Sequence, residues 1–141
     1  MPERATIERA KRDLREGKRP TTAAGEFVHE EMEHIRRGKH GARSSRQAIA
    51  IGLSKARRAG VPLPPPAVGQ TKEKTRTSAQ RASEVGQGKR KARAPSRARS
   101  QAMSRALERE GHGAASRSAL SAQAKRAPHR RASLRRAART S

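Results

Sequence analysis

Hydrophobic residues recur at intervals of three and four along the first 60 residues, which is the spacing of amphipathic helices. This pattern predicts a first helix from about Pro2 to Glu16, on which Ile7, Ala10 and Leu14 form a narrow apolar stripe. Proline suits the first turn of a helix, and Gly17 suits its C-terminal end. We therefore expect a short helix with one buried face.

A second helix is predicted from about Ala23 to Arg37, with Thr22 as its N-cap and Gly38 as its stop. Its acidic residues lie early and its arginines late, which complements the helix dipole. The apolar face of this helix consists of Val28, Met32 and Ile35, with Phe27 beside it.

The third helix has the clearest boundaries. Ser44 and Gln47 have the spacing of a capping box, in which each side chain satisfies a backbone donor near the other. Gly60 and Pro62 close the helix. One arc of it carries small and aliphatic residues, and Ile51 lies outside that arc, where we expect it to widen the core contact rather than mark a dimer seam. The arc consists of Ala48, Ile49, Gly52, Leu53, Ala56 and Ala59.

Beyond residue 60 the periodic pattern weakens. Residues 61–70 form a proline-rich linker, for which we expect an extended spacer, and residues 71–95 form a basic linker that we expect to be disordered. Residues 96–141 are a basic Ala/Arg/Ser-rich tail with partial helices at about Ser96–Glu110, Ala114–Ala127 and Arg130–Arg139. The predicted fold is all-α: a small three-helix head over residues 1–60 and a largely disordered, conditionally helical tail.

Composition supports this division, because the large apolar residues needed for a core lie mostly in the head. Phe27 is the one aromatic residue of the 141. Ordering a residue costs roughly 1–2 kcal/mol in backbone entropy, and the tail has few large side chains to offset it. The head is itself near the lower size limit for independent folding, so a homodimer or a bound polyanion would help to stabilise it.

Charge indicates the class of partner. The chain has 35 basic and 12 acidic residues and a net charge of +23. The first 60 residues contain 15 basic and 8 acidic side chains, and the remainder contains 20 and 4. A mixed-charge head followed by a basic tail is typical of nucleic-acid binding through phosphates. We expect little sequence preference and favour DNA over RNA.

Other function classes find little support in the residues. The chain has no cysteine, tryptophan or tyrosine, and it lacks a nucleophile-elbow serine and a nucleotide-binding P-loop. We therefore expect no enzyme activity, cofactor, metal or small-molecule substrate. No apolar run approaches the ~20 residues of a membrane span, so we expect a cytoplasmic protein of the bacterial nucleoid.

The best local candidate site is the segment Gly38–Arg46, in which glycines, serines and basic residues precede a helix start. Such a loop offers backbone N–H groups and positive charge to a phosphate. The alternative is an ordinary loop with a good helix cap. The residues that we predict to contact nucleic acid are Lys39, Arg43, Ser44, Arg46, Lys55, Arg57 and Arg58 in the head, and Lys89, Arg90, Lys91, Arg93, Arg130, Arg131, Arg135, Arg136 and Arg139 in the tail.

The segment His29–His34 is similar to a zinc-protease motif but has the wrong geometry. Its two histidines are five residues apart, about 140° around a helix, whereas the motif needs a separation of four. We expect a solvated acidic face at this segment.

An internal echo links the head and the tail. The pentapeptide His40-Gly41-Ala42-Arg43-Ser44 is matched in four of five positions at residues 112–116, and each copy precedes a helical pattern. In a chain rich in alanine, glycine and serine, chance explains such a match more readily than duplication does.

The segments Gly25–Glu31, Gly38–Ser44 and Gln47–Arg57, with their Gln-Ala-Ile-Ala-Ile helix, resemble a group of small basic bacterial proteins of unknown function. Some of those proteins have been labelled DNA-binding or plasmid-stabilising. From the charge of the chain we predict a nucleoid-associated or DNA-protecting accessory factor. The alternative is a plasmid-maintenance or antitoxin-like adaptor that binds a protein partner through the head. An RNA- or ribosome-associated role is a third possibility. The tail also resembles, in composition alone, the arms of bacterial histone-like proteins.

Overall fold

Every regular element in residues 2–126, the part of the chain that the computed structural model describes, is a helix. This confirms the predicted all-α class. None of the described helices combines the length and apolar character needed to cross a bilayer. In chain order the elements are α1 (Arg4–Arg15), α2 (Pro20–Arg36), α3 (Ser45–Arg58), α4 (Glu73–Gly86), α5 (Arg97–Arg109) and the 3-10 turn η1 (Gly113–Ala115), followed by a helix at 117–126.

The three helices of the head lie where the apolar pattern predicted them. Gly17 and Gly38 follow α1 and α2 with φ angles of +79° and +76°, which confirms both predicted stops. The start of α2 was predicted three residues too late. Proline fixes φ near its helical value, so the helix begins at Pro20 with Arg19 as its N-cap, and Thr22 lies inside it.

One of the two hydrogen bonds of the capping box predicted at the start of α3 is present. The Ser44 Oγ accepts a hydrogen bond from the Gln47 backbone N–H at 3.2 Å, as a capping box requires. The reciprocal bond is displaced by one residue, because the Gln47 Oε1 accepts from the backbone N–H of Arg43 at 2.7 Å. The side chain of Gln47 thus fixes the loop that enters α3.

Alanine supplies much of the core. One cluster joins α1, α2 and α3 around Phe27, and a second joins α2 and α3 to η1 around Ile35. Alanine side chains let helices approach closely, and Gly52 shows how closely: a Cβ there would lie 2.8 Å from the Cα of Val28 on α2. The buried alanines of the two clusters are Ala10, Ala23, Ala24, Ala42, Ala48, Ala56, Ala114 and Ala115.

The proline-rich segment and its successor differ from the expected spacer and disordered linker. Val61 and Leu63 are buried in the first cluster, and α4 packs on α3 through Ala79 and Ala82. The Ser83 Oγ donates to the backbone oxygen of Leu63 at 3.3 Å. The prediction relied on large aliphatic residues, and α4 packs through small ones instead.

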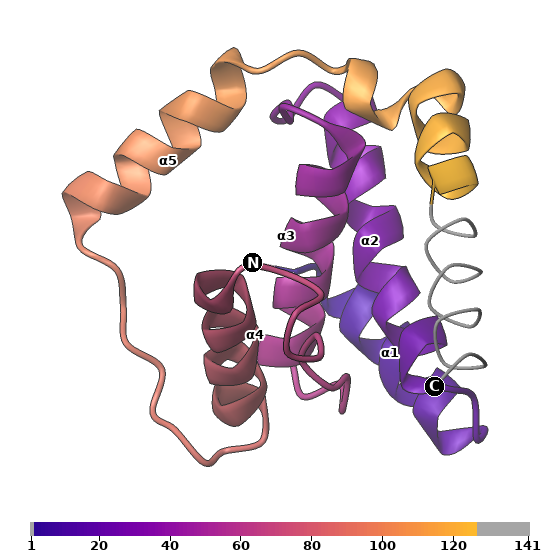
Figure 1. Cartoon of the computed structure of the whole chain (residues 1–141), viewed down its shortest axis with the longest axis vertical. Coiled ribbons are helices and arrows are strands. Elements are labelled where there is room, and N and C mark those ends of the chain that lie inside the picture. The colour runs from indigo at the N-terminus through magenta and orange to yellow at the C-terminus, as the bar shows by residue number, and fades with distance from the viewer. Residues whose placement is uncertain (1, 127–141) are drawn as a thin grey trace.

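The segment after α4 leaves the helical bundle and returns to it. Figure 1 shows α5 standing apart from α1–α4, and no residue of α5 is buried. After α5 the chain comes back, and Ala114, Ala115 and Leu120 join the core cluster of α2 and α3. The helix predicted at Ala114–Ala127 begins later, at residue 117, because residues 114 and 115 belong to η1 and Ser116 is extended. The predicted helix at Arg130–Arg139 lies outside the described residues.

The close contact between α2 and α3 gives a stability prediction. Gly52→Ala should destabilise the fold by about 1–3 kcal/mol, because its Cβ would press on the α2 backbone. The control is Gly25→Ala in α2, where a Cβ meets nothing within 4 Å and alanine should stabilise the helix by about 0.5–1 kcal/mol. Urea unfolding followed by circular dichroism measures both. Equal effects of the two substitutions would contradict the packing argument.

Candidate functional site

The loop before α3 is held against the returning C-terminal segment by backbone contacts. The N–H of Gly41 donates to the oxygen of Leu107 at 2.7 Å, and the N–H of Ala42 donates to the oxygen of Gly111 at 3.0 Å. The Ser45 hydroxyl donates to the oxygen of Ala114 at 2.5 Å. These bonds join the predicted phosphate loop to a segment about 70 positions later in the chain.

The two echoed pentapeptides share a core cluster next to these bonds, through Ala42 of the first copy and Ala114 and Ala115 of the second. Each ends in a serine that caps the helix after it: Ser44 Oγ accepts from the N–H of Gln47, and Ser116 Oγ accepts from the N–H of Ala119, both at 3.2 Å. The echo therefore has a structural counterpart, since both copies are turns that begin helices. The first N–H groups of each helix have no partner within the helix itself.

A basic hollow lies on each side of η1. The first, of about 520 Å³, lies between the start of α3 and the helix at 117–126, and its charged lining residues are Arg43, Arg46, Arg126 and Glu110. The second, of about 560 Å³, lies at the start of the helix at 117–126 and is lined by Arg36, His112, Ala115, Ser116 and Arg117. We call the first of these the α3 groove.

Arg43 and Arg46 are exposed on the rim of the α3 groove. Within residues 2–126, neither guanidinium forms an ion pair with a carboxylate. Ser44 is likewise exposed beside them. Three of the predicted contact residues are therefore brought together at one helix start.

Three other predicted contacts in the head are engaged elsewhere. Lys55 pairs with Glu31, and Lys39 lies 3.8 Å from Glu3. Arg57 is buried and donates to the backbone oxygens of Leu63 at 3.4 Å and Pro64 at 3.0 Å. Burial also lowers the pKa of the Arg57 guanidinium.

Arg57 thus holds the proline-rich segment in place, and its buried guanidinium is not available to contact a phosphate. Arg58 is exposed, as predicted for a contact residue.

In the tail, the basic cluster at residues 89–93 is exposed. Arg90 within it pairs with Glu84 at 2.8 Å. The five remaining predicted contacts, Arg130, Arg131, Arg135, Arg136 and Arg139, lie outside the described residues.

The expectation of a solvated acidic face at His29–His34 was wrong. Glu30, Glu31 and His34 are buried, and only His29 is exposed. The Glu30 Oε1 accepts the backbone N–H of Glu3 at 2.6 Å, so this carboxylate caps α1 from a neighbouring helix. The partners that make the burial tolerable come from α1, α3 and the loop after α2, which local sequence could not indicate.

Most of the acidic residues lie close to a basic side chain of the same protein. Of twelve acidic side chains, nine lie 3.9 Å or less from a lysine, arginine or histidine nitrogen. Most of the 35 basic residues therefore have no acidic counterpart within the chain. The nine are Glu3, Asp13, Glu16, Glu26, Glu30, Glu31, Glu33, Glu73 and Glu84.

A protein family of unknown function, DUF6496, matches residues 6–66. The match runs from α1 through the proline-rich segment, so it spans the three-helix head and the loop before α3. No curated protein and no solved structure matches the chain. The family match thus assigns no activity, and the functional argument depends on the site itself.

The burial of Arg57 predicts that it stabilises the fold. Arg57→Met should lower the free energy of unfolding by about 1–3 kcal/mol, because two backbone oxygens lose a charged donor. Arg58→Met, at an exposed neighbour, should change it by less than about 0.5 kcal/mol. Thermal unfolding of both variants measures this difference. An unchanged melting temperature for Arg57→Met would show that Arg57 has no structural role.

Proposed function

We propose that this protein binds nucleic acid without catalysis, by contacting phosphates with little sequence preference. Duplex DNA is the favoured partner over RNA, and a nucleoid-associated or DNA-protecting role in the bacterial cytoplasm fits this mode of binding. The observation that carries the proposal is the α3 groove, where exposed Arg43 and Arg46 flank a serine-capped helix start.

The chemistry of this groove suits a phosphate group. An arginine can donate two parallel hydrogen bonds to phosphate oxygens, and the start of a helix adds N–H groups and a positive dipole end. Glu110 also lines the groove, and its carboxylate repels anions. Three arginines against one glutamate still leave the local charge positive.

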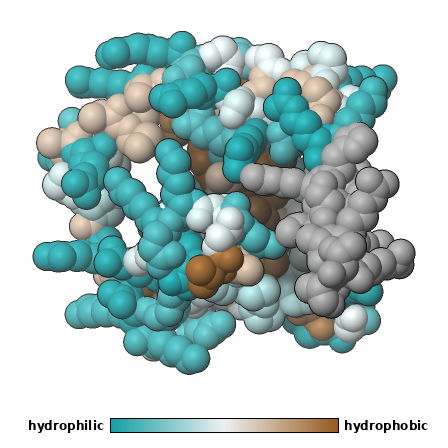
Figure 2. Space-filling view, in the orientation of Figure 1, coloured by the Kyte–Doolittle hydropathy of each residue, from teal (hydrophilic) through white to brown (hydrophobic). Residues whose placement is uncertain are grey.

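The distribution of charge extends this surface beyond the groove. Residues 97–106 of α5 are exposed on every side and include Arg97, Arg99 and Arg105. Figure 2 shows hydrophilic side chains covering most of the visible face, with few apolar patches among them. A surface of this kind gains free energy by displacing counterions from a polyanion.

The absence of accessible aromatic residues supports contact with the phosphates of the nucleic acid rather than with its bases. Binding of single strands commonly uses aromatic side chains that stack on bases. Phe27 is the one aromatic residue of the chain, and it is fully buried. Duplexes, whose phosphates are displayed outward, therefore suit this protein better than unpaired bases do.

The groove predicts a specific change in salt dependence. Arg43→Gln with Arg46→Gln should weaken binding to a 20-base-pair DNA duplex and make the slope of log K against log salt concentration shallower by about two. Arg12→Gln with Arg15→Gln is the matched control, since it removes the same charge from the last turn of α1. Fluorescence anisotropy across salt concentrations gives both slopes. Equal losses in the two double variants would contradict a role for the groove.

The terminal arginines can be tested separately. Ending the chain after residue 126 removes Arg130, Arg131, Arg135, Arg136 and Arg139 and none of the contacts described above. If all five meet phosphates, the salt slope should become shallower by up to about four. Matched DNA and RNA duplexes in the same titration test the preference for DNA. An unchanged slope would show that these arginines do not contribute to binding.

A further inference from the structure

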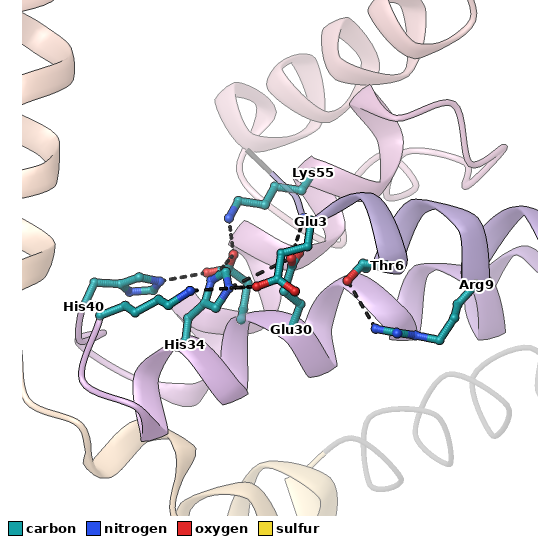
Figure 3. A network of polar contacts seen from close by, with 9 residues as sticks. Glu3, Thr6, Arg9, Glu30, His34, His40 and Lys55 are labelled. Carbon is teal, nitrogen blue, oxygen red and sulfur yellow. Dashed lines mark hydrogen bonds and ion pairs between the residues drawn. The ribbon is translucent and has the colours of Figure 1, made fainter.

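Behind the loop that precedes α3, two histidines and a glutamate converge. Glu31 and His34 lie on α2, and His40 lies on the loop between α2 and α3. One potential ligand atom from each residue lies within 4.8 Å of the other two. Glu31 is fully buried, and its Oε2 has no hydrogen-bond partner among the described residues. Figure 3 shows His34 and His40 close together, with Lys55 reaching toward them from α3.

The hydrogen bonding of His40 aims a lone pair at Glu31. The Nδ1 of His40 lies 2.9 Å from the backbone oxygen of Gly41, to which it must donate. In the neutral ring the Nε2 is then an acceptor, and it lies 3.2 Å from the Oε2 of Glu31. A lone pair and a carboxylate oxygen repel one another unless a proton or a metal cation lies between them.

His34 has a corresponding arrangement with its nitrogens reversed. Its Nε2 faces the carboxylates of Glu3 and Glu30 at 3.5 and 3.9 Å, which favours a proton on that nitrogen. Its Nδ1 then directs a lone pair toward the Oε1 of Glu31 at 3.9 Å. Metal-binding histidines characteristically donate their second N–H to a carboxylate or a backbone oxygen. His40 has such an acceptor in the backbone oxygen of Gly41. The Nε2 of His34 makes no hydrogen bond among the described residues, although the two carboxylates face it.

We propose that Glu31, His34 and His40 form a binding site for a divalent transition-metal ion, with zinc as the best match. Two imidazole nitrogens and one carboxylate are a known zinc ligand set, and water can occupy the fourth position. Zinc bonds of about 2.1 Å place tetrahedral ligand atoms about 3.4 Å apart. The Nε2 of His40 lies 3.2 Å from the Oε2 of Glu31, close to that value. The Nδ1 of His34 lies 3.9 Å from the other carboxylate oxygen, Oε1, so a single ligand oxygen requires a small adjustment of the side chains.

Lys55 is the competitor for this site. Its Nζ contacts the Oε1 of Glu31, so an ammonium group already supplies part of the compensating charge. With both histidines neutral, Glu3, Glu30 and Glu31 carry three negative charges against the two positive charges of Lys39 and Lys55. A metal ion must therefore share Glu31 with Lys55 or displace the ammonium group from it.

The site would link α2 to the loop that carries Lys39 and Arg43. This inference goes beyond the proposed nucleic-acid binding and does not depend on it, because metal uptake is measured with no nucleic acid present.

The test uses the full chain without a polyhistidine tag, stripped with a chelator and dialysed. Titration with zinc chloride in a calorimeter should show one equivalent bound with micromolar or tighter affinity. Cobalt(II) should give the visible absorption bands of a four-coordinate ion. His40→Gln should weaken zinc binding at least about tenfold, whereas His29→Gln, at an exposed histidine of α2, should leave it unchanged.

Lys55→Met separates a metal site from a network of ion pairs. Removing the competing ammonium should tighten zinc binding and increase the rise in melting temperature that zinc produces. If the network contains only ion pairs, the variant is destabilised and gains nothing from zinc. The proposal is overturned if wild type and Lys55→Met both show no heat of binding and no cobalt bands, or if His40→Gln binds zinc as well as wild type does.

Discussion

The fold depends on burying enough apolar surface with few large apolar side chains. With one aromatic residue and few aliphatics, the chain gains burial by bringing helices close together, and alanines with Gly52 permit that approach. Close helices also exclude water from whatever lies between them. The carboxylates of Glu30 and Glu31 on α2 are among the groups that this tight contact encloses.

Because the helices are close, acidic groups on α2 are enclosed and need partners. Glu30 caps the start of α1, and Glu31 is met by Lys55 and His40. Burying a charge without a partner is expensive, so these contacts fix the relative positions of α1, α2, α3 and the intervening loop. Three of the twelve acidic residues, Asp13, Glu30 and Glu31, are buried, which leaves few acidic groups on the surface to offset its basic residues.

Sequence reasoning found the elements whose signals are local. The stripe on α1, the stop at Gly38 and the cap at Ser44 each depend on a few neighbouring residues, and each was correct. Pro20, where α2 begins, is a local signal too, but the prediction with Thr22 as the N-cap did not use it.

The rest depended on contacts between distant segments. The buried residues of α4 are all small, namely Ala79, Ala82 and Ser83. The apolar pattern of this segment was therefore too weak to predict a packed helix. The sequence predicted Arg57 as an exposed cation, because it gave no sign that the proline-rich segment packs over this side chain. His29 is exposed, whereas His34 is buried. His34 faces His40, with ring centroids 6.1 Å apart, across a turn whose path the sequence did not specify.

The two echoed pentapeptides each precede a helix start, one at α3 and the other at the helix at 117–126, and residues of both helices line the α3 groove. Each start presents N–H groups and a partial positive charge, and arginines line the hollow beside it. Like charges in such proximity oppose the packing that brings them together. Buried Ala114 and Ala115 and the bonds from Gly41, Ala42 and Ser45 hold the segments in place against this repulsion. A phosphate in the α3 groove would reduce this repulsion. Binding of a phosphate there and packing of residues 111–126 against α3 should therefore reinforce one another.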